Sequence, residues 1–370
     1  MKVLHILHHI SDSLNGWHTY IAKGLQRVSN QIEQICVTPI TYKQPDNKNI
    51  NGLINVIGLN NFVIPPSGTI ILSEKMYRIL LKYLKNEWII HVHGERGSIP
   101  LFLSKFSRAR SKLILHQHSG VSSGWRTKIY SLYRYYMNDA GVKGIIVPTQ
   151  ISKKFLEHKG VEKKKIFTLS PGVGYDEKIF KPFNKQDARE FLGLKKDSFI
   201  VIYVGRFDNL KGFGKVLDIV KTLKERYDIV LLAVGGKSTD TFGEIFRKNL
   251  DYIKPFPRLD RKKLRILYAA SDCFIWICDP WVAYFGGIGV SVLEAMAMGC
   301  PIVSTTLITL NETDRSLAGY TVFDKSEALN AIKEIILDRK TFNPEKIAKN
   351  YTLSNYCQRI LKIYKSIEQN

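Results

Sequence analysis

The chain has 370 residues, which is more than one hydrophobic core usually serves, so its length favours two domains. Hydrophobic residues make up 45% of the chain, enough for well-packed cores, and no apolar run approaches the roughly 18 to 20 residues of a membrane span. The net charge is +22, of which residues 1–175 carry +15 and residues 176–370 carry +7.

The first expected element is a buried strand over residues 2–8. The apolar run from Val3 to Ile10 is short, is interrupted by histidines, and is followed by no small-residue cleavage site, so it does not resemble a signal peptide. The five cysteines form no Cys-x-x-Cys pair and lie mostly in apolar segments, which is typical of buried thiols in a reducing compartment. We therefore expect a cytoplasmic protein.

The first half alternates short apolar runs with amphipathic segments. This pattern indicates a parallel sheet covered by helices on both faces. Strands are expected over residues 2–8, 32–38, 89–93, 112–117 and 144–148, and helices over residues 17–29, 73–86, 126–139 and 150–159.

Eight of the nine histidines lie between His5 and His118. His91 and His93 end one expected strand, His116 and His118 end another, and side chains two apart on a strand face the same way. Four imidazoles at neighbouring strand ends are compatible with a metal site, as in a metal-dependent hydrolase. The other interpretation is that His91, His93 and His116 are packed or hydrogen-bonded core residues.

Basic side chains are concentrated together with aromatic ones in residues 105–112 and 125–136. Such segments are attracted to anionic lipid headgroups, which would place the protein at the inner face of a membrane as a peripheral enzyme. No nucleic-acid-binding motif accompanies them, so no nucleic acid partner is expected. The alternative is that the aromatic rings cover the sheet while the cations are solvated.

A segment rich in glycine and proline, residues 170–183, separates this half from a second strand and helix alternation. Strands are expected there over residues 199–204, 229–234, 273–277 and 301–304. We predict an N-terminal Rossmann-like domain over residues 1–175, a C-terminal Rossmann-like domain over residues 176–350, and a C-terminal helix over residues 351–370 that packs back toward the first domain.

Two segments of the second half carry candidate chemistry. Residues 199–212 form an apolar strand followed by Arg206 and Lys211 at a helix start, the place where open α/β sheets bind ligands, and the two cations suit a diphosphate. Residues 286–303 join a glycine-rich loop, a helix with Glu294, and a strand. The glycines let backbone N–H groups approach an anion at the helix start, and the Glu294 carboxylate suits sugar hydroxyls.

At these residues the chain resembles the retaining glycosyltransferases of family 4, which have the GT-B fold and use nucleotide-sugar donors. Two more segments carry the resemblance: residues 169–175, Leu-Ser-Pro-Gly-Val-Gly-Tyr, are similar to the family's interdomain Pro-Asn-Gly-Val-Asp motif, and residues 267–272, Leu-Tyr-Ala-Ala-Ser-Asp, to its Leu-Tyr-Ala-Ala-Ala-Asp motif. The resemblance implies two Rossmann-like, doubly wound parallel-sheet domains facing a central cleft.

The resemblance also implies roles for single residues. Arg206 and Lys211 would hold the donor diphosphate, and Glu294 the nucleotide ribose. His118 matches the active-site histidine, and Gly16 the second glycine of a loop that faces the cleft. No metal and no other cofactor is implied.

The chain departs from the family pattern at Gly286, where the first glutamate of the Glu-x7-Glu motif belongs. Since that glutamate contacts the donor sugar, we hypothesise that Asp279 replaces it, while the loop of Gly287, Ile288 and Gly289 completes the phosphate cradle. The competing interpretation is that Asp279 only begins the turn at Pro280.

The sequence therefore predicts a cytoplasmic, metal-independent, retaining glycosyltransferase that moves a sugar from a nucleotide-diphosphate donor to a glycan, lipid-linked or other acceptor. The alternatives are a metal-dependent hydrolase using the His-x-His pairs, and a catalytically degenerate protein of the same fold that binds a nucleotide or glycan.

Overall fold

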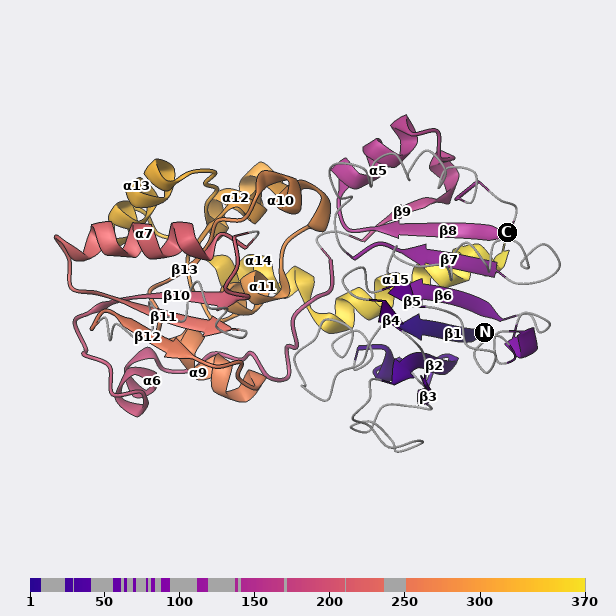
Figure 1. Cartoon of the computed structure of the whole chain (residues 1–370), viewed down its shortest axis with the longest axis horizontal. Helices are drawn as coiled ribbons and strands as arrows, with labels where there is room; N and C mark the ends of the chain where they lie inside the picture. Colours follow the sequence, from indigo (N-terminus) through magenta and orange to yellow (C-terminus); the bar gives the residue numbers. More distant parts are fainter. Residues whose placement is uncertain are drawn as a thin grey trace. The chain divides into compact units, whose positions relative to one another are not determined.

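The computed structural model divides the chain into two compact units, residues 1–173 with 354–370, and residues 174–353. We call them the first and second domains (Figure 1). The residues that the structure describes are 1–7, 24–28, 30–40, 56–60, 63–64, 69–70, 78, 81–83, 88–93, 112–118, 137–138, 141–169, 172–209, 211–235 and 251–369.

The first domain is built on a parallel sheet of seven strands in the order β3-β2-β1-β6-β7-β8-β9. The order reverses between β1 and β6, and such a switch point is where doubly wound sheets bind ligands. The strands are β1 (Lys2–Leu7), β2 (Glu33–Ile40), β3 (Val56–Asn60), β6 (Ile89–His93), β7 (Lys112–His116), β8 (Val142–Val147) and β9 (Ile166–Thr168). A separate antiparallel pair joins β4 (Val63–Ile64) to β5 (Thr69–Ile70).

The last helix of the chain, α15 (Leu353–Gln369), belongs almost entirely to the first domain. Its Ile367 side chain lies so close to β8 that a Cβ on Gly144 would stand 2.7 Å from Ile367 Cδ1. Helix α5 (Gln150–His158) begins at Thr149, whose hydroxyl accepts the Ser152 N–H at 2.9 Å and thus caps the helix.

The second domain contains a parallel sheet of six strands in the order β12-β11-β10-β13-β14-β15, with its switch point between β10 and β13. The strands are β10 (Phe199–Gly205), β11 (Ile229–Gly235), β12 (Ile253–Phe256), β13 (Cys273–Trp276), β14 (Ile302–Ser304) and β15 (Gly319–Tyr320). The inner strands are continuous buried apolar runs, as expected for a parallel sheet covered on both faces.

Helices cover both faces of this sheet. Figure 1 shows α7 and α13 side by side on one face and α6 and α9 together on the other. The helices are α6 (Lys185–Phe191), α7 (Phe213–Lys224), α9 (Arg261–Ala270), α10 (Pro280–Gly286), α11 (Val290–Ala297), α12 (Glu312–Ala318), α13 (Lys325–Ile336) and α14 (Pro344–Ala348). Asp272 ties one layer to the sheet, because its carboxylate accepts the Ile200 N–H at 2.7 Å and pairs with Arg189 of α6.

The prediction of two parallel-sheet α/β domains is confirmed. All nine strands expected from the sequence are present within a few residues of the expected bounds. Six strands were missed: β3, β9, β12 and β15, which are the edge strands of the two parallel sheets, and β4 and β5, which form the separate antiparallel pair. The expected helices over residues 17–29, 73–86 and 126–139 lie mostly outside the described residues.

All five cysteines lie among the described residues, are buried and form no disulfide, in agreement with the expectation of buried thiols from the sequence. In the described part of the chain, no single helix is long and apolar enough to cross a bilayer. Helices α10 and α11, which meet at an angle of 81°, pass that test of length and composition only when taken together.

Candidate functional site

Arg206 and Lys211 lie on one turn between β10 and α7, and Asp208 organises that turn. One Asp208 carboxylate oxygen accepts the Lys211 backbone N–H at 2.7 Å, and the other pairs with the Arg206 guanidinium at 3.0 Å. Below the turn, the buried Tyr203 hydroxyl donates to the Arg206 carbonyl at 2.7 Å. The Arg206 side chain is 67% exposed, so it is held in place but open to solvent.

Lys211 occupies a different environment from Arg206. Its ammonium lies 4.5 Å from the centre of the Trp276 ring at the end of β13, a cation–π distance. Burial lowers the pKa of Lys211 from its ordinary value. Trp276 is itself buried, and among the described residues its indole N–H has no hydrogen-bond acceptor.

Glycines at two helix starts bring these elements together. Gly212, with φ of 70°, precedes α7, and a Cβ there would stand 1.8 Å from the Ile277 carbonyl oxygen. Gly289 precedes α11, and its Cβ would stand 2.4 Å from the Trp276 ring. Since no larger residue fits at either position, the turn with the two cations and the glycine-rich loop both lie against the end of β13.

The proposed substitute acid, Asp279, begins helix α10. Its carboxylate accepts the Trp281 N–H at 2.8 Å, which caps the helix, and its side chain is exposed. The helix ends at Gly286, and Gly287 follows with φ of 73°, while Ile288 is buried. The capping contact gives Asp279 a structural role, and its sugar-binding role stays a prediction.

Glu294 lies inside the domain on α11 and is only 3% exposed. Its two carboxylate oxygens accept hydrogen bonds from Arg261 Nε at 3.2 Å and from the Tyr268 hydroxyl at 3.3 Å. Burial raises the pKa of Glu294, and the Arg261 guanidinium opposes that shift. A carboxylate has about four lone-pair positions, so two remain for a further hydroxyl.

These contacts concentrate positive potential where β10 and β13 end. Lys211 and the N-termini of α7 and α11 lie around the end of β13, Arg206 lies on the same turn as Lys211, and helix N-termini favour anions. The arrangement suits a ligand with two phosphates, because Arg206 offers a planar fork and Lys211 a point charge.

The histidines of the first domain form a connected cluster on β1, β6 and β7. His5 lies opposite His91, and His93 opposite His116, in the strand registers. Four hydrogen bonds connect the cluster: His5 Nδ1 to His93 Nε2, His93 Nδ1 to His118 Nε2 and His91 Nε2 to His116 Nδ1, each at 3.1 Å, and His91 Nδ1 to the Tyr364 hydroxyl of α15.

Burial keeps most of these imidazoles neutral. It lowers the pKa of His5 and of His116 to about 3, and it also lowers the pKa of His91 and of His93, with neighbouring histidines adding to the effect. The prediction that the two members of each His-x-His pair face the same side is confirmed, since the paired rings stack at 3.9 Å and 3.8 Å.

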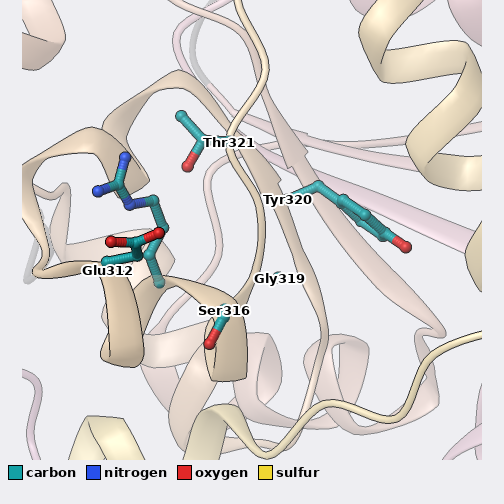
Figure 2. A pocket seen from close by; sticks show the side chains of 6 residues that line it. Glu312, Ser316, Gly319, Tyr320 and Thr321 are labelled. Carbon is teal, nitrogen blue, oxygen red and sulfur yellow. The ribbon is translucent and has the colours of Figure 1, made fainter.

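Several expected features fall elsewhere. Gly16 and all but Lys112 of the two basic segments, residues 105–112 and 125–136, lie outside the described residues. A pocket of about 270 Å³ opens beside the edge strand β15. Figure 2 shows Glu312 and Ser316 of α12 at this pocket, with the Tyr320 ring pointing away from them. The site residues expected from the sequence are absent from its lining.

Four residues of these clusters were not singled out from the sequence: Trp276, Arg261, Tyr268 and Tyr364. Tyr268 lies in the Leu-Tyr-Ala-Ala-Ser-Asp segment, so the motif itself contained the signal. Arg261 follows Asp260, whose carboxylate caps α9. Tyr364 faces the cluster from more than 240 residues away in the sequence, and no local pattern indicates such a contact.

Comparisons with known proteins agree with this geometry. Residues 184–352 match the family "Glycosyl transferases group 1". A D-inositol 3-phosphate glycosyltransferase from Kribbella flavida is 28% identical over 47% of this chain and 44% of its own length. The processive diacylglycerol alpha-glucosyltransferase of Acholeplasma laidlawii is 22% identical over 75% of this chain and 85% of its own length. The chain thus spans less than half of the first relative and most of the second.

Among solved structures, Anabaena HepE in complex with UDP-glucose has a TM-score of 0.74 at 16% identity, covering 99% of this chain and 100% of HepE. This similarity identifies the GT-B fold. The family match and the relatives together support a group 1 glycosyltransferase.

Proposed function

We propose that the chain is a retaining glycosyltransferase whose second domain binds a nucleotide-diphosphate sugar. One observation carries the proposal: Arg206 and Lys211 lie on a single turn, fixed by Asp208, at the switch point of the second sheet. Open α/β sheets bind their ligands at this point.

The two cations define the chemistry that the site performs. When the bond between the sugar and the diphosphate breaks, negative charge grows on the leaving oxygen. Arg206 and Lys211 stabilise that charge more strongly than they stabilise the bound donor, and this difference lowers the barrier. The Trp276 indole N–H and the backbone N–H groups around Gly287 and Gly289 are further donors for phosphate oxygens. With this compensation, the reaction needs no divalent ion.

UDP-sugars are the first donors to test, because the HepE structures contain UDP, UDP with glucose, or UDP-glucose. We assign Glu294 to the ribose and His118 to the sugar on the basis of the resemblance. The acceptor is a glycan or a lipid-linked molecule held by the first domain. The diacylglycerol glucosyltransferase among the relatives favours a lipid, and the basic composition of the first half suits a peripheral position at the inner face of the membrane.

The decisive experiment is transfer itself. The purified chain is incubated with UDP-sugars one at a time, together with glycan and glycerolipid acceptors, and the products are identified by mass spectrometry. We expect one donor to give an acceptor with one added sugar of unchanged anomeric configuration. Binding of UDP without transfer from any nucleotide sugar would instead favour a catalytically degenerate binding protein. That alternative is suggested by Gly286, which occupies the position of the family's first glutamate.

A further inference from the structure

Three imidazoles at the outer end of the histidine cluster converge on one point. His93 ends β6, His116 ends β7, and His118 follows two residues later. Each offers a ring nitrogen, and the three nitrogens lie within 4.8 Å of one another. The His93 Nδ1 and His118 Nε2 atoms are 3.1 Å apart. Two nitrogens bound to one tetrahedral zinc at about 2.0–2.1 Å would be separated by roughly 3.3 Å, so this pair already has nearly the spacing of two ligands.

The second ring nitrogens of His93 and His116 are hydrogen-bonded to other histidines. His93 Nε2 bonds His5 Nδ1, and His116 Nδ1 bonds His91 Nε2, each at 3.1 Å. His91 is in turn held by the Tyr364 hydroxyl. Histidines that bind metals nearly always have their second nitrogen fixed in this way, because the outer contact sets the tautomer and the ring orientation.

A second trio, His5, His91 and His93, meets the same distance criterion but is fully buried. The outer trio contains His118, the partly exposed member of the cluster, and so has access to solvent. The two trios share His93, and a neutral imidazole can coordinate through only one of its two ring nitrogens, so a neutral His93 serves one trio at a time. Three neutral imidazoles with a fourth, solvent-filled position form a well-attested zinc site.

We propose that His93, His116 and His118 form an inhibitory site for a single transition-metal ion, with zinc as the probe. The ion would bind through the three imidazole nitrogens and a water molecule. Since the ion would take the His118 nitrogen, occupancy would remove that side chain from the transfer reaction. This inhibition rests on the proposed function, whereas the binding of the ion does not.

Binding is tested first, on the full chain after removal of metals by a chelator. Zinc is titrated in competition with a chromophoric chelator, and cobalt is added separately because a tetrahedral cobalt site absorbs visible light. We expect one ion per chain. His118→Asn should lose at least tenfold in zinc affinity, and the exposed His158→Asn, the matched control, should lose none.

His118 is partly exposed, so its substitution is expected to leave the fold intact. A second variant, His116→Asn, removes a buried ligand. If it fails to fold, the cobalt spectrum and the zinc titration of His118→Asn still decide whether the site binds metal. Failure to bind zinc at micromolar concentration, or full affinity in His118→Asn, would overturn the site.

Activity is tested second, with the donor and acceptor that the transfer experiment identifies. Micromolar zinc should inhibit transfer by at least tenfold, a chelator should restore it, and His116→Asn should stay active in zinc. Zinc binding without inhibition would overturn the inhibitory role and would indicate that His118 takes no part in the transfer reaction. A chain that transfers no sugar would refute the proposed function, while the titration would still report on the site.

Discussion

The two domains differ in the state of the ionisable groups in and beside their central sheets. In the first domain, His5, His91, His93 and His116 are buried side by side and remain neutral, with one imidazole bonding the next. In the second domain, charges are kept and paired: Glu294 with Arg261, and Arg206 with Asp208. The two domains should therefore respond differently to acid and to substitution. Acid adds charge to the buried histidines of the first domain, whereas substitution of one member of an ion pair in the second domain leaves the other member without that partner.

Acid should therefore damage the first domain before the second. The folded-state pKa of His5 and of His116 is about 3, below the unfolded value of 6.5, so the unfolded state binds more protons as the pH falls. Each of the two histidines should cost about 2 kcal/mol of stability at pH 5, and lowered values at His91 and His93 add in the same direction. Burial raises the pKa of Glu294, so the contribution of this residue opposes the histidine effect as the pH falls.

Hydrogen exchange, corrected for intrinsic rates, measures this difference domain by domain between pH 7 and pH 5. Peptides from β1, β6 and β7 should lose protection first. His5→Leu should flatten the dependence on pH, and the exposed His158→Leu should leave it unchanged. Earlier loss of protection in β10 and β13 would contradict the prediction, because it would show that acid destabilises the second domain first.

Removing one partner of the buried pair should destabilise the second domain. Glu294→Ala leaves the Arg261 guanidinium, which is 11% exposed, without its carboxylate, at a cost of about 3–5 kcal/mol. Glu294→Gln keeps an acceptor for Arg261 and should cost about 1–2 kcal/mol. Denaturant unfolding provides both values, and equal losses in the two variants would indicate that the charge of Glu294 contributes nothing to the fold.

Substitution of Asp279 should have the smallest effect, and it separates two roles. Asp279→Asn keeps the cap on α10 but removes the charge, whereas Asp279→Ala removes both and should also cost about 1 kcal/mol of stability. If Asp279 replaces the glutamate missing at Gly286, both variants should lose roughly ten- to hundredfold in kcat/KM with the preferred donor and keep their affinity for UDP. Unchanged kinetics in Asp279→Asn would leave capping as the role of Asp279. Increased activity in Gly286→Glu would show that the site had only lost its acid.

The strands that could be predicted from the sequence are those with neighbours on both sides. The central strands β1, β6, β10 and β13 are buried, and β10 and β13 read as continuous apolar runs, whereas buried histidines interrupt the apolar runs of β1 and β6. The missed edge strands pair on one side only, so their composition is less constrained. β12 contains Lys254 and Pro255, and β15 has only two residues.

The residues of the candidate site could likewise be predicted only in part from the sequence. Arg206, Lys211 and Glu294 stand out because each lies beside a glycine-marked turn or helix start. Their partners Trp276, Arg261 and Tyr268 come from other elements and meet them only through the fold, as Tyr364 meets His91. Sequence patterns indicate which elements exist and where they end, whereas contacts between distant elements depend on tertiary packing.

The account's central claim is that Arg206 and Lys211 together hold the donor diphosphate. Calorimetric titration of UDP into the wild type, Arg206→Ala, Lys211→Ala and the double variant tests it directly, with the exposed Lys221→Ala in the last turn of α7 as the control. We expect each single variant to lose roughly ten- to hundredfold in affinity, the double variant to lose less than the product of the two because both cations bind one anion, and the control to lose nothing. Wild-type affinity for UDP in both single variants would contradict the claim.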